Sequence, residues 1–297
     1  MSKSSDRVRK EFAANDAVRD AGLTMPDDIL RMDDIAYGSE PEQVLDVYRP
    51  KDEEGNLPVI VSVHGGGWVY GDKKLYQYYT MNLAQRGFAV VNFSYRLAPE
   101  TKYPAQLEDV NTVFAFVREF ADRFGFDTDN IFGVGDSAGA HLLALYCDVC
   151  TNPAYAKNYH FAKPVGSAPK AISLACGAYT IEGGDSETQQ QNMELMGDLL
   201  PDGVTEESLA LIDVRRHITP AFPPVFFFTC TGDFLQEQAD ILHLTLREQS
   251  VPHVLRYYGD AEHSLGHVFH CNIRSEHAVK CNDDQCEFFR KVMAGRF

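Results

Sequence analysis

Short, almost continuously apolar runs alternate along this chain with segments of helical character, and this alternation limits the fold more than any other feature. The runs that we predict to be strands are Val44–Tyr48, Val59–Val63, Ala89–Phe93, Ile131–Val134, Ala171–Ala175, Val225–Cys230 and His253–Tyr258. The helix-like segments are Leu75–Arg86, Leu107–Arg123, Ala138–Val149, Gln236–Gln249 and Asp283–Val292. Continuously apolar strands are buried on both faces, so the pattern predicts an α/β domain whose mostly parallel central sheet is flanked by helices.

Two segments do not fit this alternation: the N-terminal residues 1–32 and the polar, Gln-rich residues 180–220. Val8 and Phe12 give the first segment a rough helical stripe. Both segments are either peripheral helices and loops or a small helical cap over a substrate site, because long insertions in compact domains are often functional. We therefore predict a single domain over residues 1–297, with cap elements from about 1–32 and about 180–220.

Charge and cysteine content exclude several classes of protein. The 297 residues include 27 basic and 43 acidic side chains, a formal net charge of −16, which argues against nucleic acid or an anionic membrane as the main partner. No apolar run reaches the roughly 18 residues of a membrane span. The N-terminus lacks the apolar region of a signal peptide, so we expect a cytoplasmic protein. The odd count of 7 cysteines favours reduced thiols over a disulfide framework.

The pentapeptide Gly135-Asp136-Ser137-Ala138-Gly139 lies between a predicted strand and a predicted helix. It matches G-x-S-x-G, the tight turn that exposes a nucleophilic serine at a helix N-terminus, where the helix dipole favours a developing anion. The pattern also arises by chance in glycine-rich loops, but the strand before it and the helix after it argue against chance. Ser137 is therefore the candidate nucleophile.

A second motif, residues 64–68 (HGGGW), directly follows the predicted strand Val59–Val63. Acyl transfer creates a negative oxygen that needs preorganised donors, and glycines let backbone N–H groups approach it closely. We expect the N–H groups of Gly65, Gly66 and Ala138 to form this oxyanion hole, and His64 to be structural. Phosphate binding is the alternative for such a loop, but the Lys-Ser/Thr of a P-loop is missing.

A serine nucleophile needs a base, and the base needs an orienting acid. Asp233 follows the strand Val225–Cys230, and His263 follows the strand His253–Tyr258. The carboxyl ends of parallel strands lie along one edge of a sheet, where ligands bind. We therefore predict Asp233 as the acid and His263 as the base. Asp260 is too close in sequence to His263 to reach round its ring easily.

A metal site is the alternative for the nearby His267, His270 and Cys271, which follow His263 at helical spacing. Such stripes more often pack or face solvent, and no carboxylate motif accompanies this one, so we expect no metal. No cofactor-binding loop is visible, and we expect no cofactor.

Together these residues resemble the hormone-sensitive-lipase-like branch of the α/β-hydrolase fold, which includes bacterial carboxylesterases and acetyl esterases. The resemblance rests on HGGGW at 64–68, SYRLAPE at 94–100 followed by YPA at 103–105, GDSAG at 135–139, and Asp233 with His263. It implies the α/β-hydrolase fold, a Ser137–Asp233–His263 triad, an oxyanion loop at Gly65–Gly66 and a cap over the site. Ser264-Leu265 stands where Gly-Phe often follows the family's histidine.

The expected function is that of a serine carboxylesterase that hydrolyses short acyl esters, acetyl to butyryl, through an acyl-enzyme. Trp68 and Tyr70 follow the oxyanion loop and either shorten the acyl pocket or pack against the cap or core. The expected partner is a small-molecule ester, with no nucleic acid and no membrane, and the sequence leaves a homodimer open.

Three other functions remain open at this point. A carbohydrate esterase would remove acetyl or feruloyl groups from plant polysaccharide fragments with the same residues. A serine peptidase or amidase would reuse the triad on amide bonds. A non-catalytic binding protein would keep the fold alone, although such proteins often lose a triad member and all three roles are filled here.

Overall fold

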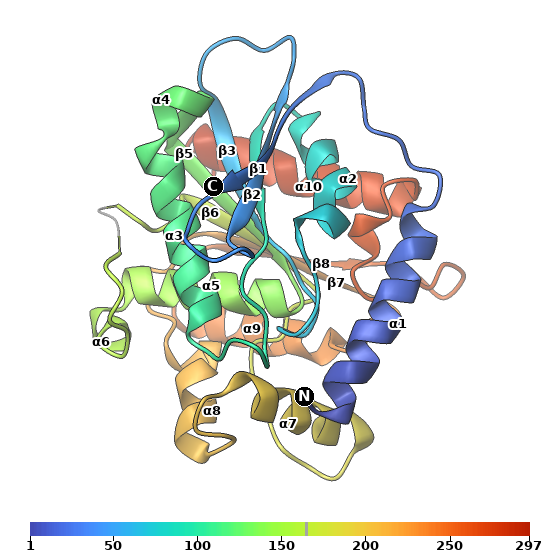
Figure 1. Ribbon diagram of the computed structural model, residues 1–297, viewed down its shortest axis with the longest axis vertical. Helices are drawn as coiled ribbons and strands as arrows, with labels where there is room; N and C mark the ends of the chain where they lie inside the picture. Colours follow the sequence, from blue (N-terminus) through green and yellow to red (C-terminus); the bar gives the residue numbers. More distant parts are fainter. Residues whose placement is uncertain (164–165) are drawn as a thin grey trace.

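The computed structural model describes residues 1–163 and 166–297, and in this part of the chain it contains one eight-stranded sheet in the order β1-β2-β4-β3-β5-β6-β7-β8 (Figure 1). The strands are β1 (Ile29–Ala36), β2 (Val44–Pro50), β3 (Leu57–Val63), β4 (Ala89–Phe93), β5 (Phe126–Asp136), β6 (Ala171–Ala175), β7 (Val225–Cys230) and β8 (His253–Tyr258). β2 pairs antiparallel with β1 and β4, and every pairing from β4 to β8 is parallel. The mostly parallel sheet is confirmed.

Strand β1 was missed by the sequence pattern. Its apolar residues Leu30 and Met32 are interrupted by Arg31 and by the acidic pair that follows, as suits an edge strand with solvent on one side. The segment 1–32, which was expected to contribute cap elements, therefore includes the start of the sheet, because Ile29–Met32 pair with β2.

Helices cover both faces of the sheet. α2 (Lys73–Ala84) and α10 (Glu276–Met293) pack on one face, and α3 (Ala105–Glu119), α5 (Ala138–Thr151) and α9 (Gln236–Glu248) pack on the other. The remaining helical elements are α1 (Lys3–Asp20), α4 (Ala121–Phe124), α6 (Pro153–Ala156), α7 (Glu187–Leu199), α8 (Glu206–Ile212) and the short 3₁₀ turns Val214–Arg216 and Phe269–Cys271. This arrangement agrees with the predicted layers.

The central strands supply both halves of the core by simple alternation. In β7, Val225 and Phe227 face the layer of α3, α5 and α9, whereas Phe226 and Phe228 face the layer of α2 and α10. All four side chains are buried, which explains why the run is continuously apolar.

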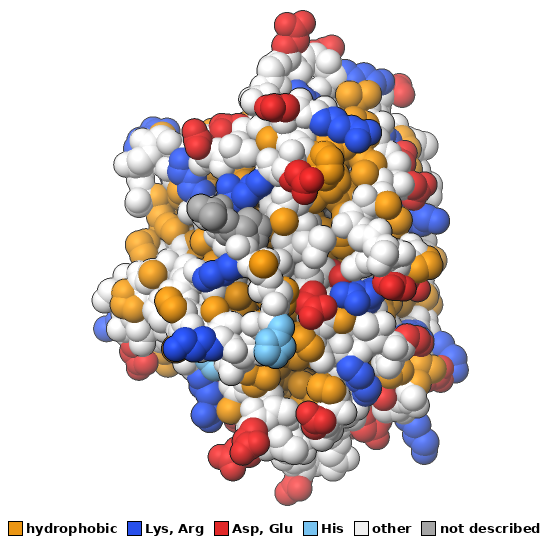
Figure 2. Space-filling view, turned by 60° about the vertical axis from the view of Figure 1, so that its left-hand side comes forward, with side chains coloured by type: hydrophobic (Ala, Val, Ile, Leu, Met, Phe, Trp, Pro, Cys, Tyr) orange, Lys and Arg blue, Asp and Glu red, His pale blue; other side chains and the backbone are white. Residues whose placement is uncertain are grey.

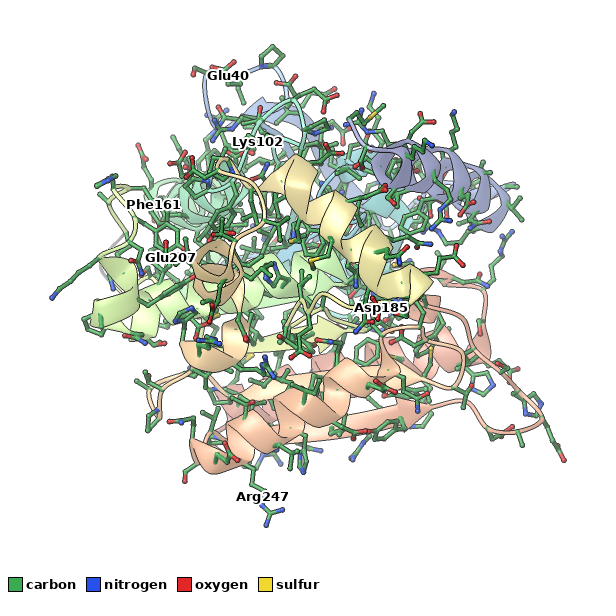
Figure 3. All side chains as sticks on the ribbon, turned by 90° about the horizontal axis from the view of Figure 1, so that it is seen from below. Glu40, Lys102, Phe161, Asp185, Glu207 and Arg247 are labelled. Carbon is green, nitrogen blue, oxygen red and sulfur yellow. The ribbon has the colours of Figure 1, made fainter. Side chains whose placement is uncertain are left out.

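Helices α1 and α7 lie side by side at the carboxyl edge of the sheet, and Figure 3 shows α7 crossing the molecule beside α1. Oδ2 of Asp198 accepts hydrogen bonds from the Ser2 N–H and the Ser5 hydroxyl, both at 2.6 Å. Lys102 holds the other side of α7 by donating to the carbonyl of Gly197. The two segments that broke the strand–helix alternation therefore contact each other.

On the face drawn in Figure 2, acidic and basic side chains are interspersed with apolar ones. Within residues 1–163 and 166–297, no helix combines the length and apolar character that a bilayer span requires.

Candidate active site

Ser137 occupies the turn between β5 and α5 in a strained conformation, with φ 50° and ψ −118°. The turn is possible only with small neighbours: a Cβ on Gly139 would lie 2.1 Å from the carbonyl oxygen of Val63, and one on Gly135 would lie 2.7 Å from the carbonyl oxygen of Gly139. The strand, the tight turn and the helix are all where the sequence predicts them. They present Ser137 at the N-terminus of a long helix.

Asp233 is held by His267 and not by His263. Nδ1 of His267 lies 2.7 Å from Oδ1 of Asp233, which also accepts a hydrogen bond from the Leu235 N–H at 2.9 Å. Oδ2 accepts from the Thr229 hydroxyl at 2.7 Å. Burial acts to raise the pKa of Asp233, but these hydrogen bonds, above all that of His267, outweigh it and hold this pKa below its usual value.

The prediction of His263 as the base is wrong. Its side chain is 59% exposed, and its Nδ1 lies 3.1 Å from Oδ1 of Asp260, a contact that the sequence argument considered difficult. His267 reaches Asp233 in place of His263 because of the path of the loop after β8. Gly232 and Gly266 form an isolated parallel bridge, so the residues that follow them, Asp233 and His267, are brought together. The intervening residues 260–264 are exposed.

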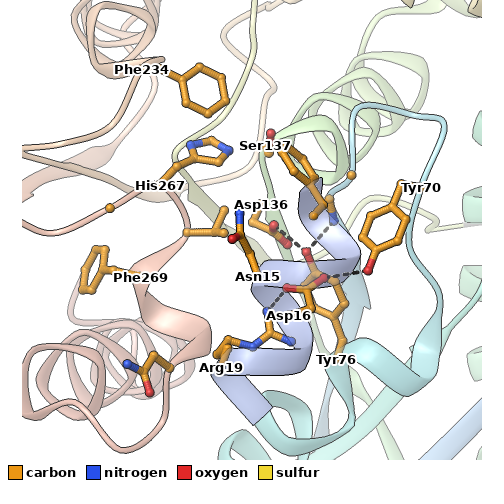
Figure 4. A pocket seen from close by; sticks show the side chains of 16 residues that line it. Asn15, Asp16, Arg19, Tyr70, Tyr76, Asp136, Ser137, Phe234, His267 and Phe269 are labelled. Atoms are coloured by element: carbon orange, nitrogen blue, oxygen red, sulfur yellow. Dashed lines mark hydrogen bonds and ion pairs between the residues drawn. The ribbon is translucent and has the colours of Figure 1, made fainter. Parts of the chain in front are cut away.

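The second ring nitrogen of His267 is available for proton transfer. Nε2 is buried and has no hydrogen-bond partner in the described part of the chain. His267 and Ser137 line the same cavity, in which Figure 4 shows their side chains as neighbours. A histidine whose Nδ1 is fixed by a carboxylate and whose Nε2 is free is arranged to accept a proton from a nearby hydroxyl.

In the glycine loop, the structure contradicts one of the predicted donors. The Gly65 N–H donates to the hydroxyl of Tyr76 at 3.0 Å, so it is already engaged. The N–H groups of Gly66, Gly67 and Ala138 have no acceptor among the described residues. Gly67 and Ala138 line the cavity on one side of Ser137 and Gly66 lines the cavity on the other.

Tyr76 connects the glycine loop to the nucleophile turn. Its hydroxyl donates to Oδ2 of Asp136 at 2.7 Å while it accepts from Gly65. Burial raises the pKa of Asp136 to about 6, although the Tyr76 hydrogen bond acts in the opposite direction. His64 is structural, as expected: its ring stacks on Tyr95 at 4.0 Å, and burial lowers its pKa to about 4.

Two cavities meet at Ser137. One of about 420 Å³ is lined by His267 and by polar residues of α1, and the other of about 340 Å³ is lined by apolar and polar side chains alike. Both are lined by Phe12, Ser137 and Phe234. Helices α1 and α7 supply walls of the smaller cavity, so both segments that broke the sequence alternation adjoin the candidate nucleophile.

Trp68 and Tyr70 lie on opposite sides of this site. Trp68 is buried, lines the smaller cavity and donates its indole N–H to Nδ1 of His141 at 3.2 Å. Tyr70 lines the larger cavity and donates to Oδ2 of Asp16 at 2.9 Å. Both side chains therefore pack against their surroundings and line a cavity at once.

The His267, His270 and Cys271 cluster that sequence spacing suggested does not form. His270 and Cys271 are buried in the core, where His270 packs edge-on against Tyr79. Among the described residues, the ligand-type atoms of one group, Cys176, Asp233 and His267, lie within 4.8 Å of one another. In that group Asp233 and His267 are hydrogen-bonded to each other. All seven cysteines are free thiols in the structure, with no disulfide between them.

Comparison with known proteins identifies relatives of one kind. A family model described as BD-FAE matches residues 45–245. Esterase LipC of Mycobacterium tuberculosis is 38% identical over 123 residues, which are 41% of this chain and only 30% of LipC. Versiconal hemiacetal acetate esterase of Dothistroma septosporum is 28% identical over 235 residues, 73% of this chain and 69% of that protein. A crystal structure of inhibited esterase B from Lactobacillus rhamnosis superposes with a TM-score of 0.90 at 22% identity, covering 99% of this chain and 98% of that one.

Proposed function

The chain belongs to the BD-FAE family, within the hormone-sensitive-lipase-like α/β-hydrolases, and from that premise we propose that it is a serine carboxylesterase. The observation that carries the proposal is the 2.7 Å hydrogen bond between Asp233 and His267, which leaves Nε2 of His267 free in a cavity that Ser137 also lines. The proposed triad is therefore Ser137, His267 and Asp233.

In the proposed reaction, Nε2 of His267 accepts the proton of the Ser137 hydroxyl as its oxygen attacks the ester carbonyl carbon. Asp233 holds the imidazole in the required tautomer and stabilises its cationic form. The carbonyl oxygen becomes negative and accepts hydrogen bonds from the N–H groups of Gly66 and Ala138, with Gly67 beside them.

Collapse of this intermediate breaks the bond to the alcohol oxygen, which takes the proton from His267 and leaves. Water then repeats the sequence on the acyl-enzyme. His267 takes a proton from the water as its oxygen attacks the acyl carbon, and returns that proton to the Ser137 oxygen as the bond to the acyl carbon breaks. Apart from the water, the groups used in these steps are side chains and backbone N–H groups of this chain.

Short acyl groups are the proposed acyl half of the substrate. The smaller cavity has the buried side chains of Trp68, Ile181 and Leu195 in its wall. Trp68 is fixed by its hydrogen bond to His141, and packed core side chains move little. These fixed, bulky side chains limit the space left for the acyl chain, and this supports acetyl to butyryl groups as the acyl half.

The test compares purified wild type with Ser137→Ala on p-nitrophenyl esters from acetate to decanoate. We expect wild-type activity to be highest on the short esters and Ser137→Ala to lower kcat by several orders of magnitude. A fluorophosphonate should label wild type and not the variant. An unlabelled wild type would favour a binding protein, and faster turnover of an amide than of the matched ester would favour a peptidase.

A further inference from the structure

A buried thiol lies beside the Asp233–His267 pair, and the proposed reaction makes no use of it. The thiol belongs to Cys176, which directly follows β6, just as Asp233 follows β7 and His267 follows β8. One ligand-type atom of each residue, a sulfur, a carboxylate oxygen and a ring nitrogen, lies within 4.8 Å of the other two. The carboxyl ends of three adjacent parallel strands therefore bring three different metal-binding groups to one point.

Cys176 is not arranged as a nucleophile. The residue is 1% exposed, and the neighbouring Cys230 thiol together with burial raises the pKa of the Cys176 thiol well above its usual value. A neutral, buried thiol is unreactive. The Cys230 thiol is itself engaged, since it donates to the carbonyl oxygens of Leu265 at 3.2 Å and Gly266 at 3.1 Å. A metal ion that displaces the proton of Cys176 is the reagent that could use this sulfur.

The three donors match a soft divalent cation. Zinc is bound in proteins by thiolate, imidazole and carboxylate groups, usually with four ligands in a tetrahedron. Its bonds of about 2.0–2.3 Å place ligand atoms roughly 3.3–3.8 Å apart, so the three side chains need to move by only about 1 Å to hold the ion. A water molecule can supply the fourth ligand. Magnesium and calcium prefer oxygen ligands alone and are poorly suited to this set.

The charges of the site balance for a divalent ion. A Cys176 thiolate and the Asp233 carboxylate supply two negative charges, and a neutral His267 adds none. Asp233 has a side chain that is 0% exposed, so an uncompensated charge here would be costly. A dication cancels both negative charges, whereas a monovalent cation leaves one of them unbalanced.

The larger cavity gives such an ion a route to the site. His267 lines this cavity, and its side chain is 12% exposed (Figure 4). Asp16 and Asp136 line the same cavity, and the whole chain has a formal net charge of −16. A negative field of this kind raises the local concentration of cations.

A metal ion on His267 prevents the proposed catalysis. If the ion takes Nδ1, it breaks the hydrogen bond to Asp233, and the imidazole proton must then sit on Nε2, which can no longer accept the proton of Ser137. If the ion takes Nε2, it occupies the accepting lone pair directly. Binding releases one proton, that of the Cys176 thiol, and involves no oxidation or reduction.

We propose that Cys176, Asp233 and His267 form a binding site for a soft divalent cation, zinc or cadmium, and that its occupation switches the enzyme off. The inhibition rests on the esterase function proposed above, whereas the binding of the ion does not. The site is regulatory and not a catalytic metal centre, because the ion takes over the groups that the reaction itself needs.

The first experiment measures inhibition. Wild type, Cys176→Ser and Cys176→Ala are assayed on p-nitrophenyl acetate at rising zinc concentrations, and each rate is referred to the metal-free rate of the same protein. We expect zinc to inhibit wild type and a chelator to reverse the inhibition. Both variants should need at least about tenfold more zinc for half-inhibition, since a ligand is lost or replaced by a poorer one. The control Cys150→Ser removes a half-buried thiol that contacts Ser167, and it should be inhibited as wild type is. Magnesium at the same concentrations should inhibit none of the proteins.

The second experiment measures binding without activity. Ser137→Ala is titrated with cadmium, and the ultraviolet charge-transfer absorption of the cadmium–thiolate bond is followed. We expect one equivalent of cadmium to give this absorption and the double variant Ser137→Ala, Cys176→Ser to lose it.

Three results would each overturn the proposal: no inhibition of wild type by zinc, equal zinc sensitivity in wild type and both Cys176 variants, or a cadmium absorption that does not depend on Cys176. If wild type hydrolyses no p-nitrophenyl ester while the cadmium absorption does depend on Cys176, the esterase function fails and the metal site stands.

Discussion

Nδ1 of His267 lies 2.7 Å from Oδ1 of Asp233, while His263, four positions earlier in the chain, faces solvent beside Asp260. The two histidines therefore make a direct test of the site. His267→Ala should lower kcat on p-nitrophenyl acetate by several orders of magnitude, because the proton acceptor is lost. His263→Ala should keep kcat within about twofold of wild type, as surface substitutions usually do. The opposite pattern would restore His263 as the base.

Loss of the Tyr76 hydroxyl should impair catalysis more than binding. Tyr76→Phe leaves the Gly65 N–H without its acceptor and Asp136 without its donor, so the glycine loop is less firmly held beside Ser137. We expect kcat to fall about three- to tenfold with little change in KM. Tyr79→Phe is the control, because it also removes a buried hydroxyl from α2. That hydroxyl contacts Gln285 and not the glycine loop. Equal effects on kcat in both variants would show that general loosening of α2 is responsible.

The smaller cavity, which is proposed to hold the acyl group, should accept longer acyl chains when a side chain of α7 in its wall is shortened. Leu195→Ala enlarges the smaller cavity and should raise the octanoate-to-acetate ratio of kcat/KM. Leu199→Ala, on the same helix and also buried, removes the same side chain without touching the cavity. Both variants should lose about 2–5 kcal/mol of unfolding free energy. Only the first should change the chain-length profile, and a parallel change in both would contradict the assignment.

Because of Asp136, the free energy of unfolding should fall as the pH rises, whereas an aspartate with a lowered pKa has the opposite effect. Its pKa is raised from 3.8 to about 6 by burial, so the folded state binds its proton more tightly than the unfolded state does. The stabilisation is complete below pH 3.8 and is lost as the pH rises to about 6. Relative to Asp136→Asn, which cannot titrate, wild type should lose on the order of 2–3 kcal/mol of unfolding free energy across this window.

Denaturant titrations of the two proteins between pH 4 and pH 7 measure this difference, and subtracting one from the other cancels groups that titrate in both. A wild-type free energy of unfolding that rises with pH relative to that of Asp136→Asn would contradict the assignment. Arg19 and His267 also face Asp136, so the comparison is best made at constant ionic strength.

The sequence predicted the parts of the molecule that depend on local patterns. Continuous apolar runs identified the strands from β2 to β8, and the G-x-S-x-G turn identified Ser137 because backbone strain there demands glycine neighbours. Strand β1 was missed because an edge strand buries only part of its surface, and its charged residues hide the alternation.

The choice between His263 and His267 could not be made from spacing. Both follow β8, and what separates them is a long-range bridge between Gly232 and Gly266 that fixes where the loop returns to the sheet. Gly266, directly before His267, was the one local sequence signal for this return of the loop. The engagement of the Gly65 N–H depends in the same way on a distant side chain, the Tyr76 hydroxyl.

Helix α1 lies outside the sheet, yet its Phe12 forms part of the wall of both cavities. The sheet and α5 hold the nucleophile, and a different element, α1, shapes part of its surroundings. An engineer who wishes to change which esters are accepted can randomise the inward-facing positions of this single helix while leaving the α/β scaffold untouched. Natural variants would be free to diverge along the same route.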